Sequence, residues 1–342
     1  SLVDSMAGSV NTPPNKDIRW EKTTTVNVGV DFALFRHRLS GTIEYYNKYS
    51  VDLLAAINGS PTQGFGYTTL MTNNGKMVNR GVEITLSGEI IRQKDFSWNA
   101  SLLYAFNRNK VKHISVQPSL WDSRISMPTS YPMVGKPLYG IYAYKWAGLN
   151  ENGDPQVYDA ENNVTSGPAR DYHALVYCGT TVPIHNASLT NVLRYKGFEF
   201  SAMLILDAGH KLRSSNIPSI NMSNGRITST AKGIVDRWTQ PGDVTDVPRL
   251  LFSNDTENFN THRTELYRYS DLFVYDASNI RLSNISLAYR VPAHWCKKIS
   301  LSGARLQFNV ENVATFAFDS KANYDLGGKV KPNYVWGLYL NF

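Results

Sequence analysis

The sequence contains no long hydrophobic run. A membrane-spanning helix needs about 18 consecutive apolar residues, whereas the longest apolar stretches here, such as Ala202–Leu206, have the length of a strand. The chain is still 42% hydrophobic, with a mean hydropathy of −0.31. Apolar residues are therefore abundant but interrupted by polar ones. Two classes fit this combination: a soluble β protein, and a β-barrel whose strands show the membrane an apolar face by alternation.

Cysteine is scarce, and the histidines form no recognisable site. The two thiols, Cys178 and Cys296, fall at opposite ends of the fold when the strands described below are counted, so we expect no disulfide between them. The seven histidines show no paired metal-binding spacing, and no acid/base or nucleophile arrangement emerges. Asn150–Asp154 partly imitates a calcium loop, but Gly148 stands where the first ligand should be, so an Asn/Gly turn is predicted. The sequence predicts no catalytic residue, no metal site and no cofactor.

A signal peptide and a concentrated charge are also missing. Ser1 is not an initiator Met, and no charged segment followed by an apolar core is present. We therefore expect the chain to begin in the middle of a longer protein or to be a processed piece. The formal charge is +7, but the 35 Lys and Arg residues are scattered, which argues against nucleic-acid binding. Short basic clusters at Arg36–Arg38, Arg92–Lys94 and Lys297–Lys298 fall in expected turns and are interpreted as a solvated or headgroup-facing rim.

Alternation with a period of two is what the sequence has in abundance. In the segment 26–32, for example, the even-numbered residues are apolar and share one face. The strands expected from this signal cover 26–32, 39–46, 81–87, 96–106, 186–195, 198–206, 279–289, 299–310 and 334–342. A Tyr-rich stretch, Leu138–Leu149, is expected to add one or two further strands. In Asn279–Tyr289 the apolar residues change from even-numbered to odd-numbered positions, which predicts a β-bulge near Asn284.

The connections between these strands are unequal in length. The turns within each pair are a few residues long, whereas the intervening segments, about 51–74, 107–183, 209–277 and 314–332, are much longer. Outer-membrane barrels have short periplasmic turns and long extracellular loops, whereas a β-sandwich more often mixes loop lengths at both ends. If Phe342 lies at the periplasmic end, every short turn falls on that side. We therefore predict an all-β fold, a transmembrane antiparallel up-and-down β-barrel, with a soluble secreted carbohydrate-binding β-sandwich as the alternative.

Short motifs along the chain resemble the barrel of SusC/RagA-type TonB-linked outer-membrane transporters. They are Arg19–Thr24, Val28–Asp31, Leu39–Tyr46, Asn74–Glu83, Phe106–Val111, Tyr195–Glu199, Arg237-Trp238, Asn279–Asn284, Val310–Val313 and the terminal Phe342. Each motif is weak alone, but their order and spacing together are specific. The resemblance runs from about Trp20 to the end of the chain.

The resemblance implies a place in the outer membrane of Bacteroidetes-type bacteria. Members of that family carry an N-terminal plug inside a barrel of about 22 strands, pair with a SusD-like surface lipoprotein, and import oligosaccharides or peptides with energy relayed by TonB. The 342 residues contain no segment expected to form a plug or a TonB box, and about nine strands cannot close such a barrel. Residues 1–19 are therefore expected to be a lead-in segment from a preceding loop, and residues 20–342 the C-terminal portion of the barrel. The plug and the remainder of the barrel would then be partners outside this chain, with outer-membrane lipid around it.

Several residues are candidates for particular roles. Glu44, Glu83 and Glu199 fall on the polar face of their strands, where we expect them to line the lumen and to hydrogen-bond a plug or waters. Trp121 and Tyr131, in the longest loop, are candidates for stacking on substrate, although both residues could instead pack the loop on itself or on a lid partner. Trp238 is expected to anchor a loop. The predicted assembly signal consists of Tyr334, Trp336, Leu338, Leu340 and Phe342.

Overall fold

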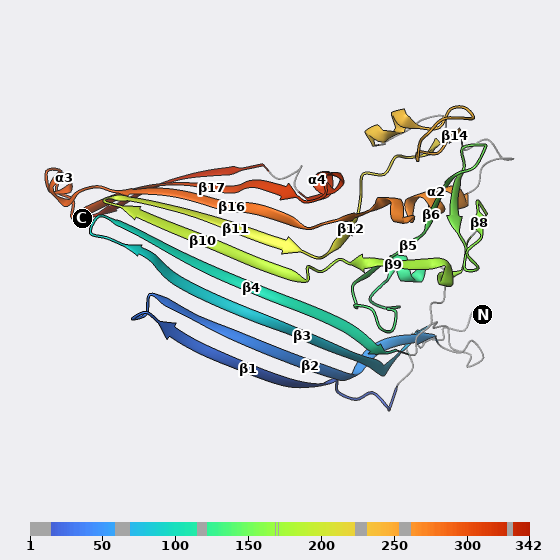
Figure 1. Ribbon diagram of the computed structural model, residues 1–342, viewed down its shortest axis with the longest axis horizontal. Helices are drawn as coiled ribbons and strands as arrows, with labels where there is room; N and C mark the ends of the chain where they lie inside the picture. The colour runs from blue at the N-terminus through green and yellow to red at the C-terminus, as the bar shows by residue number, and fades with distance from the viewer. Residues whose placement is uncertain are drawn as a thin grey trace, which may run out of the picture.

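The chain forms one large antiparallel sheet with irregular segments at one end (Figure 1). The computed structural model describes residues 15–58, 69–114, 122–167, 169, 171–222, 231–252, 261–326 and 331–342. Nine strands follow one another in the order β1-β2-β3-β4-β10-β11-β16-β17-β18. Their bounds are β1 Lys22–Leu34, β2 Leu39–Asn58, β3 Thr69–Arg92, β4 Phe96–His113, β10 His185–Tyr195, β11 Phe198–Ala208, β16 Asn279–Arg290, β17 Gly303–Ala317 and β18 Asn333–Asn341.

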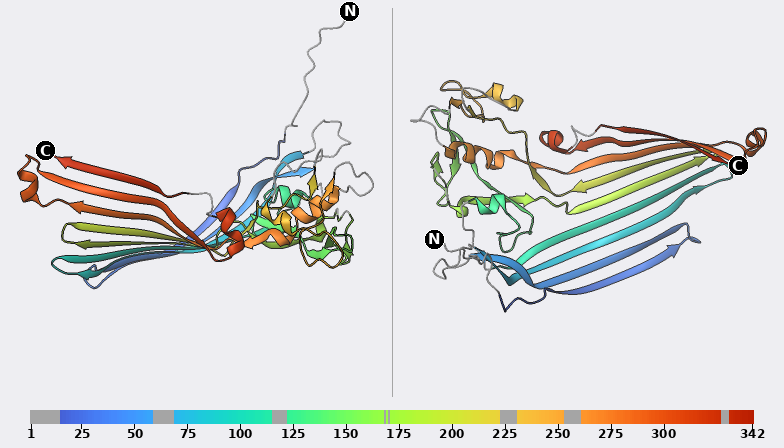
Figure 2. Two further views of the ribbon diagram at one scale, coloured as in Figure 1. Left: turned by 90° about the horizontal axis from the view of Figure 1, so that it is seen from above. Right: turned by 180° about the vertical axis from the view of Figure 1, so that it is seen from behind.

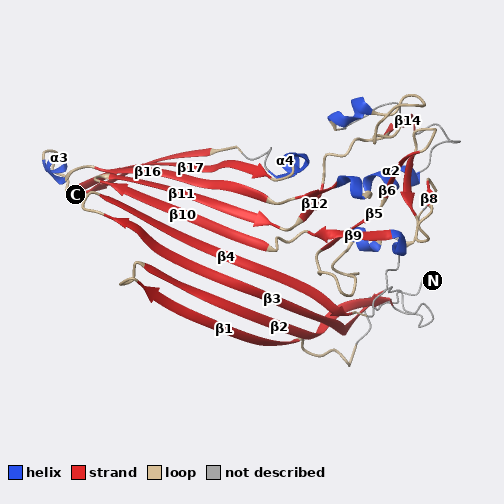
Figure 3. Cartoon of the chain, viewed as in Figure 1, coloured by secondary structure: helices blue, strands red, loops and turns tan. Residues whose placement is uncertain are grey.

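The remaining elements are short and lie beyond the ends of these strands (Figure 3). The small strands are β5 Gly140–Tyr144, β6 Trp146–Leu149, β7 Pro155–Tyr158, β8 Val164–Thr165, β9 Leu175–Thr180, β12 Lys211–Arg213, β13 Asn221–Met222, β14 Leu251–Phe252 and β15 Val274–Asp276. The helices are α1 Ser123–Ser126, α2 Thr261–Arg268, α3 Ala293–Lys297 and α4 Asn323–Leu326, with 3-10 turns η2 Tyr172–Ala174, η3 Lys232–Asp236, η4 Asp271–Phe273 and η5 Ser320–Ala322. In the described ranges no helix is long and apolar enough to cross a membrane.

The strand register places apolar and polar residues on opposite faces of the sheet. One transverse row reads Val30, Ile43, Ile84, Tyr104, Ala187, Leu206, Ile280 and Phe316. The next row, on the other face, reads Asp31, Thr42, Thr85, Leu103, Ser188, Ile205, Arg281 and Thr315. We call these two sides the apolar face and the polar face. The period-two signal therefore identified the nine strands and their orientation correctly.

The apolar face has the height of a membrane core. On β4 its residues run from Phe96 to Phe106, which at a rise of about 3.4 Å per residue and a tilt of about 40° gives a band about 26 Å tall. Aromatic side chains mark both ends of this band. At the end of the short turns they are Phe96, Trp98, Tyr195, Phe198, Tyr289 and Trp336, and at the end of the long loops they are Tyr45, Tyr104, Phe106 and Phe316. This arrangement matches the interfacial belts of membrane barrels.

Two polar side chains within the apolar band, Asn191 and His185, have hydrogen-bond partners on the neighbouring strand. The indole Nε1 of Trp98 donates to Asn191 Oδ1 at 3.0 Å, across neighbouring strands. The hydroxyl of Tyr104 lies 2.9 Å from His185 Nδ1. Because hydrocarbon offers no hydrogen-bond partners, such pairing is what allows polar side chains to face it.

Two glycines on β2 and β3 leave room for aromatic rings on the facing strand. A Cβ at Gly41 would collide with the ring of Phe32, its register partner, and with the carbonyl oxygen of Thr85. A Cβ at Gly81 would collide with the ring of Tyr46, again the register partner. In each case the ring lies over the glycine backbone and compensates for the missing side chain.

The β-bulge predicted near Asn284 is confirmed. Both neighbours of β16 change register there: the shift lies between Met203 and Leu204 on one side and between Leu282 and Asn284 on the other. Ser283 is the extra residue, and it moves the apolar set back onto the correct face.

Some predicted strand boundaries are wrong. The segment 51–74 was expected to be a loop, but β2 continues to Asn58 and β3 begins at Thr69. The pairing of β2 with β3 continues past a second bulge, where Asp52 has a φ of 57°. The bulge interrupts the alternation of apolar and polar residues, although the backbone pairing of the two strands goes on. At the other end of the sheet, the segment expected to begin a strand at Ile299 belongs instead to the connection that contains α3, and β17 extends from Gly303 to Ala317.

The β-sandwich alternative is also wrong. It required two sheets packed face to face, whereas the described residues contain one nine-stranded sheet and four smaller sheets of two or three strands. The stretch Leu138–Leu149 does form two strands, β5 and β6, but they pair with β9 and β7 and do not join the large sheet. The sheet is open, since its outer strands β1 and β18 are not paired with each other.

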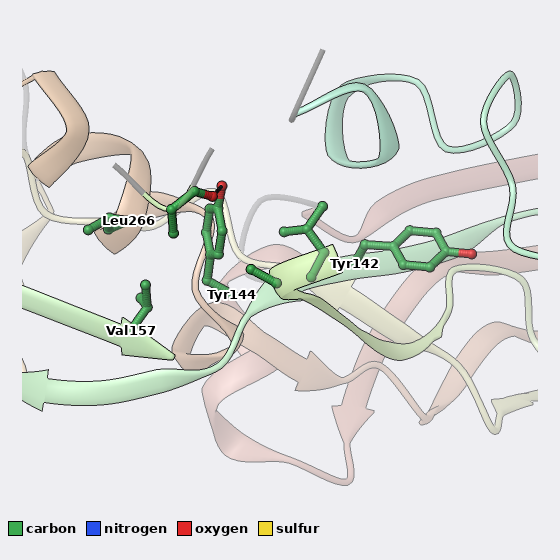
Figure 4. Packing of buried hydrophobic residues seen from close by; sticks show 7 residues of the cluster. Tyr142, Tyr144, Val157 and Leu266 are labelled. Carbon is green, nitrogen blue, oxygen red and sulfur yellow. Dashed lines mark hydrogen bonds between the residues drawn. The ribbon is translucent and has the colours of Figure 1, made fainter. Parts of the chain in front are cut away.

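The long connections fold together at one end of the sheet. We call residues 122–183 and 209–277, as far as they are described, the loop assembly, and this end of the sheet the loop end; the opposite end, with the short turns, is the turn end (Figure 2). Tyr142, Tyr144, Val157, Leu175 and Leu266 form its buried core (Figure 4). A second cluster contains Ile220, Tyr267 and Phe273. The loop assembly therefore has a hydrophobic core of its own, drawn from segments far apart in the sequence.

A buried charged network ties the two long segments together. Asp154 accepts hydrogen bonds from Arg249, at 3.0 and 2.9 Å, and from Arg263 Nε at 2.8 Å. Arg263 is only 3% exposed and also donates to the carbonyl oxygen of Arg249 at 2.7 Å. Burial lowers the pKa of Arg263, while Asp154 raises it again. Both oxygens of the Asp154 carboxylate are thus committed to arginine.

The Asn/Gly turn predicted at Asn150–Asp154 is confirmed. Asn150 Oδ1 accepts hydrogen bonds from the backbone N–H groups of Asn152 and Asp154, at 3.0 and 2.8 Å, and Gly153 has a φ of 74°. The ring of Trp238 lies where a Cβ on Gly153 would be. Trp238 therefore contacts the turn from the other long segment, which fits its predicted role as a loop anchor.

If the apolar face contacts lipid, a charge in the middle of the band is costly. In the full-length protein, Leu189→Arg should destabilise the folded state by about 2–4 kcal/mol. Thr190→Arg, one residue away on the polar face, is the matched control and should leave the folded fraction in the membrane nearly unchanged. Folded and unfolded forms are separated by their heat-dependent mobility in gel electrophoresis. Equal loss in both variants would contradict the assignment of the two faces.

The Asp154 network should hold the loop assembly closed. Asp154→Asn leaves the nearly buried Arg263 without its carboxylate, which we expect to cost about 3–5 kcal/mol of local stability. Limited proteolysis of the detergent-solubilised protein should then cut the loop assembly at least about tenfold faster. Asp159→Asn is the control, because that carboxylate caps an exposed turn through Asn163. Unchanged cleavage in Asp154→Asn would show that the network is not needed.

Candidate functional site

The polar face carries two carboxylates side by side near the loop end. Glu44 and Glu83 are register partners on β2 and β3, at the positions expected from the sequence. None of the ion pairs among the described residues involves either of them. Like charges directly opposite each other on a sheet are destabilising. This pair therefore favours a cationic or hydrogen-bond-donating group placed against it.

Glu199, the third predicted carboxylate, is bound within the sheet. Its oxygens accept from Arg194 Nε at 2.7 Å and from Arg305 at 3.2 Å. Arg305 lies on β17 and reaches Glu199 on β11 across β16, where Ala288 is only 3% exposed. The small alanine side chain leaves space for this crossing. Strands β10, β11 and β17 are thereby linked by ion pairs in addition to the backbone hydrogen bonds of the sheet.

A hollow of about 370 Å³ lies on the polar face between Glu83 and Asp207. Thr85, Leu103 and Ser188 also line it. Asp207 accepts from Asn186 Nδ2 at 2.7 Å and pairs with Arg281 at 3.5 Å. The surface of this hollow thus mixes carboxylate, hydroxyl and aliphatic groups, which suits passage of a polar solute better than tight binding of one ligand.

A larger cavity, of about 490 Å³, lies in the loop assembly. Its lining includes Ser215, Thr264, Tyr267 and two arginines, Arg213 and Arg268. Arg213 donates to three backbone carbonyls, including that of Tyr142 at 2.6 Å, and burial lowers its pKa. Hydroxyl and guanidinium donors beside an aromatic ring can bind either hydroxyl or amide groups. The residues that line this cavity follow no periodic pattern, so no signal in the sequence predicts it.

The structure describes one of the two predicted substrate-stacking residues. Trp121 lies outside the described residues. Tyr131 is 6% exposed, in the turn after α1, so little of its ring is available to a ligand in this conformation. Substrate contact by either residue stays a prediction.

The cysteines lie far apart, as predicted. Cys178 is in β9 of the loop assembly and Cys296 is in α3 at the turn end, and both are free thiols. Burial raises the pKa of Cys178 to about 11, with a further contribution from Asp271, so its thiol is protonated and unreactive at neutral pH. Within the described ranges, no cluster of three or more His, Cys, Asp or Glu side chains could hold a metal ion.

Comparison with solved structures supports the fold. A structure of the RagAB peptide transporter superposes with a TM-score of 0.77 over 100% of this chain and 38% of that chain, at 23% identity. A second structure, of the RagAB peptide importer in an open-open state, gives a TM-score of 0.74 over 99% of this chain. The chain therefore shares its fold with part of those proteins.

Sequence comparison gives the family. TonB-dependent receptor P3 of Formosa agariphila is 25% identical over 95% of this chain, and TonB-dependent receptor SusC of Bacteroides thetaiotaomicron is 25% identical over 87%. The chain spans 33% and 29% of those two relatives, which are named receptors and not enzymes. Residues 2–313 match the family described as TonB dependent receptor-like, beta-barrel. The chain therefore belongs to the TonB-dependent receptor-like β-barrel family and forms part of an outer-membrane barrel.

Proposed function

We propose that the chain is the C-terminal part of a TonB-dependent transporter that imports oligosaccharides or peptides across the outer membrane. One observation supports this most strongly: a single nine-stranded sheet, apolar on one face and polar on the other, superposes along its whole length on the barrel of a peptide transporter. In this proposal the apolar face contacts lipid and the polar face lines the path of the substrate.

The barrel is proposed to be closed by the remainder of the same protein. β1 and β18 each have one unpaired edge in the described sheet, and an open edge is unfavourable in hydrocarbon. The chain spans about a third of the relatives it matches, which leaves ample length for the other strands of a barrel of about 22. A plug in that remainder would receive the pull of TonB.

The loop assembly is proposed to face the exterior and to receive substrate. Its 490 Å³ cavity offers hydroxyl, guanidinium and aromatic groups, and both sugars and peptides present hydroxyl or amide groups to such a lining. We propose that a SusD-like surface lipoprotein covers this end as a lid. Trp121 and Tyr131 are assigned to loop packing or lid contact, with stacking on substrate as the second role.

The polar-face carboxylates divide into two roles in this proposal. Glu44 and Glu83, which have no cationic partner among the described side chains, contact a donor on the plug. Glu199, held by Arg194 and Arg305, stiffens the wall. The exposed stripe of β18, together with the residue that follows the strand, contributes to assembly of the barrel; its members are Tyr334, Trp336, Leu338, Leu340 and Phe342.

Import through the polar face can be tested with a bulky substitution. Ser188→Trp fills the hollow beside Asp207 and should reduce uptake of a labelled oligosaccharide or peptide several-fold, because it narrows the path. Leu189→Trp, its neighbour on the apolar face, is the control and should transport normally. Uptake is measured in cells that carry the full-length protein at equal surface levels. Normal uptake in both variants would count against a path along this wall.

The role of Glu44 and Glu83 can be tested by removing their charge. In the full-length protein, Glu44→Gln combined with Glu83→Gln should weaken contact with the plug and raise passive entry of a large antibiotic several-fold, since a loosened plug leaks. Glu89→Gln is the control, because Glu89 already pairs with Arg92 at the turn end. Equal permeability in the double variant and the control would refute the plug contact.

A further inference from the structure

Basic residues gather on the apolar side of the sheet immediately beyond the loop-end aromatic belt. Arg80 and Arg108 are register partners on β3 and β4. They lie two residues beyond Val82 and Phe106, which are register partners in the loop-end belt, and alternation keeps them on the same face. Lys110 follows on β4 and Lys76 on β3, and all four side chains are exposed. We call Lys76, Arg80, Arg108 and Lys110 the basic patch.

The basic patch has no acidic partner in the described part of the chain. None of the salt bridges found there involves any of the four residues. Arg80 Nε donates to the neutral Asn47 Oδ1 at 2.9 Å. Two cationic groups directly opposite each other destabilise a sheet unless an anion lies between or beside them. The patch is therefore a surface of uncompensated positive charge.

A fifth cation from the loop assembly extends the patch. The carbonyl oxygen of Lys136 accepts from Val111 N at 2.9 Å, which fixes this segment against the end of β4. The Lys136 ammonium lies 4.8 Å from the centre of the Tyr177 ring. Lys136, Tyr177 and Arg108 line one cavity of about 150 Å³. A small anionic group would meet both a lysine and an arginine there.

We propose that the basic patch binds the phosphate of an anionic lipid headgroup in the leaflet at the loop end. The basic patch begins one row beyond the aromatic belt, at the height along the strands where lipid headgroups lie. A guanidinium binds phosphate oxygens in a bidentate manner, and lysine adds a strong point charge. The patch is also continuous with the apolar band, so that acyl chains of the same lipid would lie on Val82, Tyr104 and Phe106 directly below. A free phosphate ion would use only the upper part of this surface.

The proposal depends on the barrel's place in the membrane and not on what the transporter carries. The test uses the full-length protein in nanodiscs of phosphatidylcholine containing a minor fraction of phosphatidic acid. Native mass spectrometry of the released protein counts the phosphatidic acid molecules retained. Arg80→Gln combined with Arg108→Gln should reduce this retention about thirtyfold, since each basic side chain contributes about fivefold at a membrane surface. Lys48→Gln is the matched control: Lys48 lies at similar height on the polar face, over the ring of Tyr46, and its loss should change nothing.

Two further measurements distinguish lipid binding from a folding defect and from the binding of free phosphate. Arg80→Lys combined with Arg108→Lys keeps the charge and should keep most of the retention, which separates lipid binding from a folding defect. Inorganic phosphate, added alone at millimolar concentration, should not displace the retained lipid. Retention equal to wild type in the double glutamine variant, or displacement by inorganic phosphate, would overturn the proposal.

Discussion

The hydrogen bonds between neighbouring strands are the constraint on which the rest of this structure depends. In hydrocarbon a backbone N–H or C=O has no water to bind, so each must be paired with the next strand. The nine strands satisfy this requirement in an unbroken order from β1 to β18. Because neighbouring strands satisfy the backbone hydrogen-bonding groups, the sheet does not need a hydrophobic core on either face. On the apolar face, the polar side chains of Asn191 and His185 each have a hydrogen-bond partner. Gly41, on the apolar face, lets the ring of Phe32 cover backbone that would otherwise face the hydrocarbon.

The loop assembly follows a different physical rule from the sheet. Its stability comes from a buried core around Tyr142, Tyr144 and Leu266 and from one carboxylate shared between two arginines. Such contacts are those of a water-soluble domain, in which removal of apolar surface from water drives folding. The chain thus combines a large sheet that is stabilised by backbone hydrogen bonds with a loop assembly that is stabilised by side-chain contacts.

The alternation of apolar and polar residues predicted the large sheet well and the loop assembly poorly, and the reason is physical. Lipid on one side and a polar interior on the other enforce strict alternation, so strands such as β4 and β11 can be read directly from the sequence. Beyond Asp52, β2 and β3 continue past the apolar band, and there the alternation disappears although the pairing does not. In the loop assembly the decisive contacts are non-local: Arg249 and Asp154 are 95 residues apart. No short-range signal indicates that pairing, nor the burial of Tyr131, nor the cavity beside Arg213.

The shared carboxylate of Asp154 also bears on how such proteins diversify. Surface loops of barrels usually vary independently, because each is attached only to its own hairpin. Here one long connection supplies the carboxylate and another supplies both guanidinium groups. A recombination event that replaced only one of these connections would leave either Arg249 and the buried Arg263, or the partly buried Asp154, without its counter-charge. The two segments therefore form a single heritable unit, and a change of specificity at this end of the protein requires that they be exchanged together.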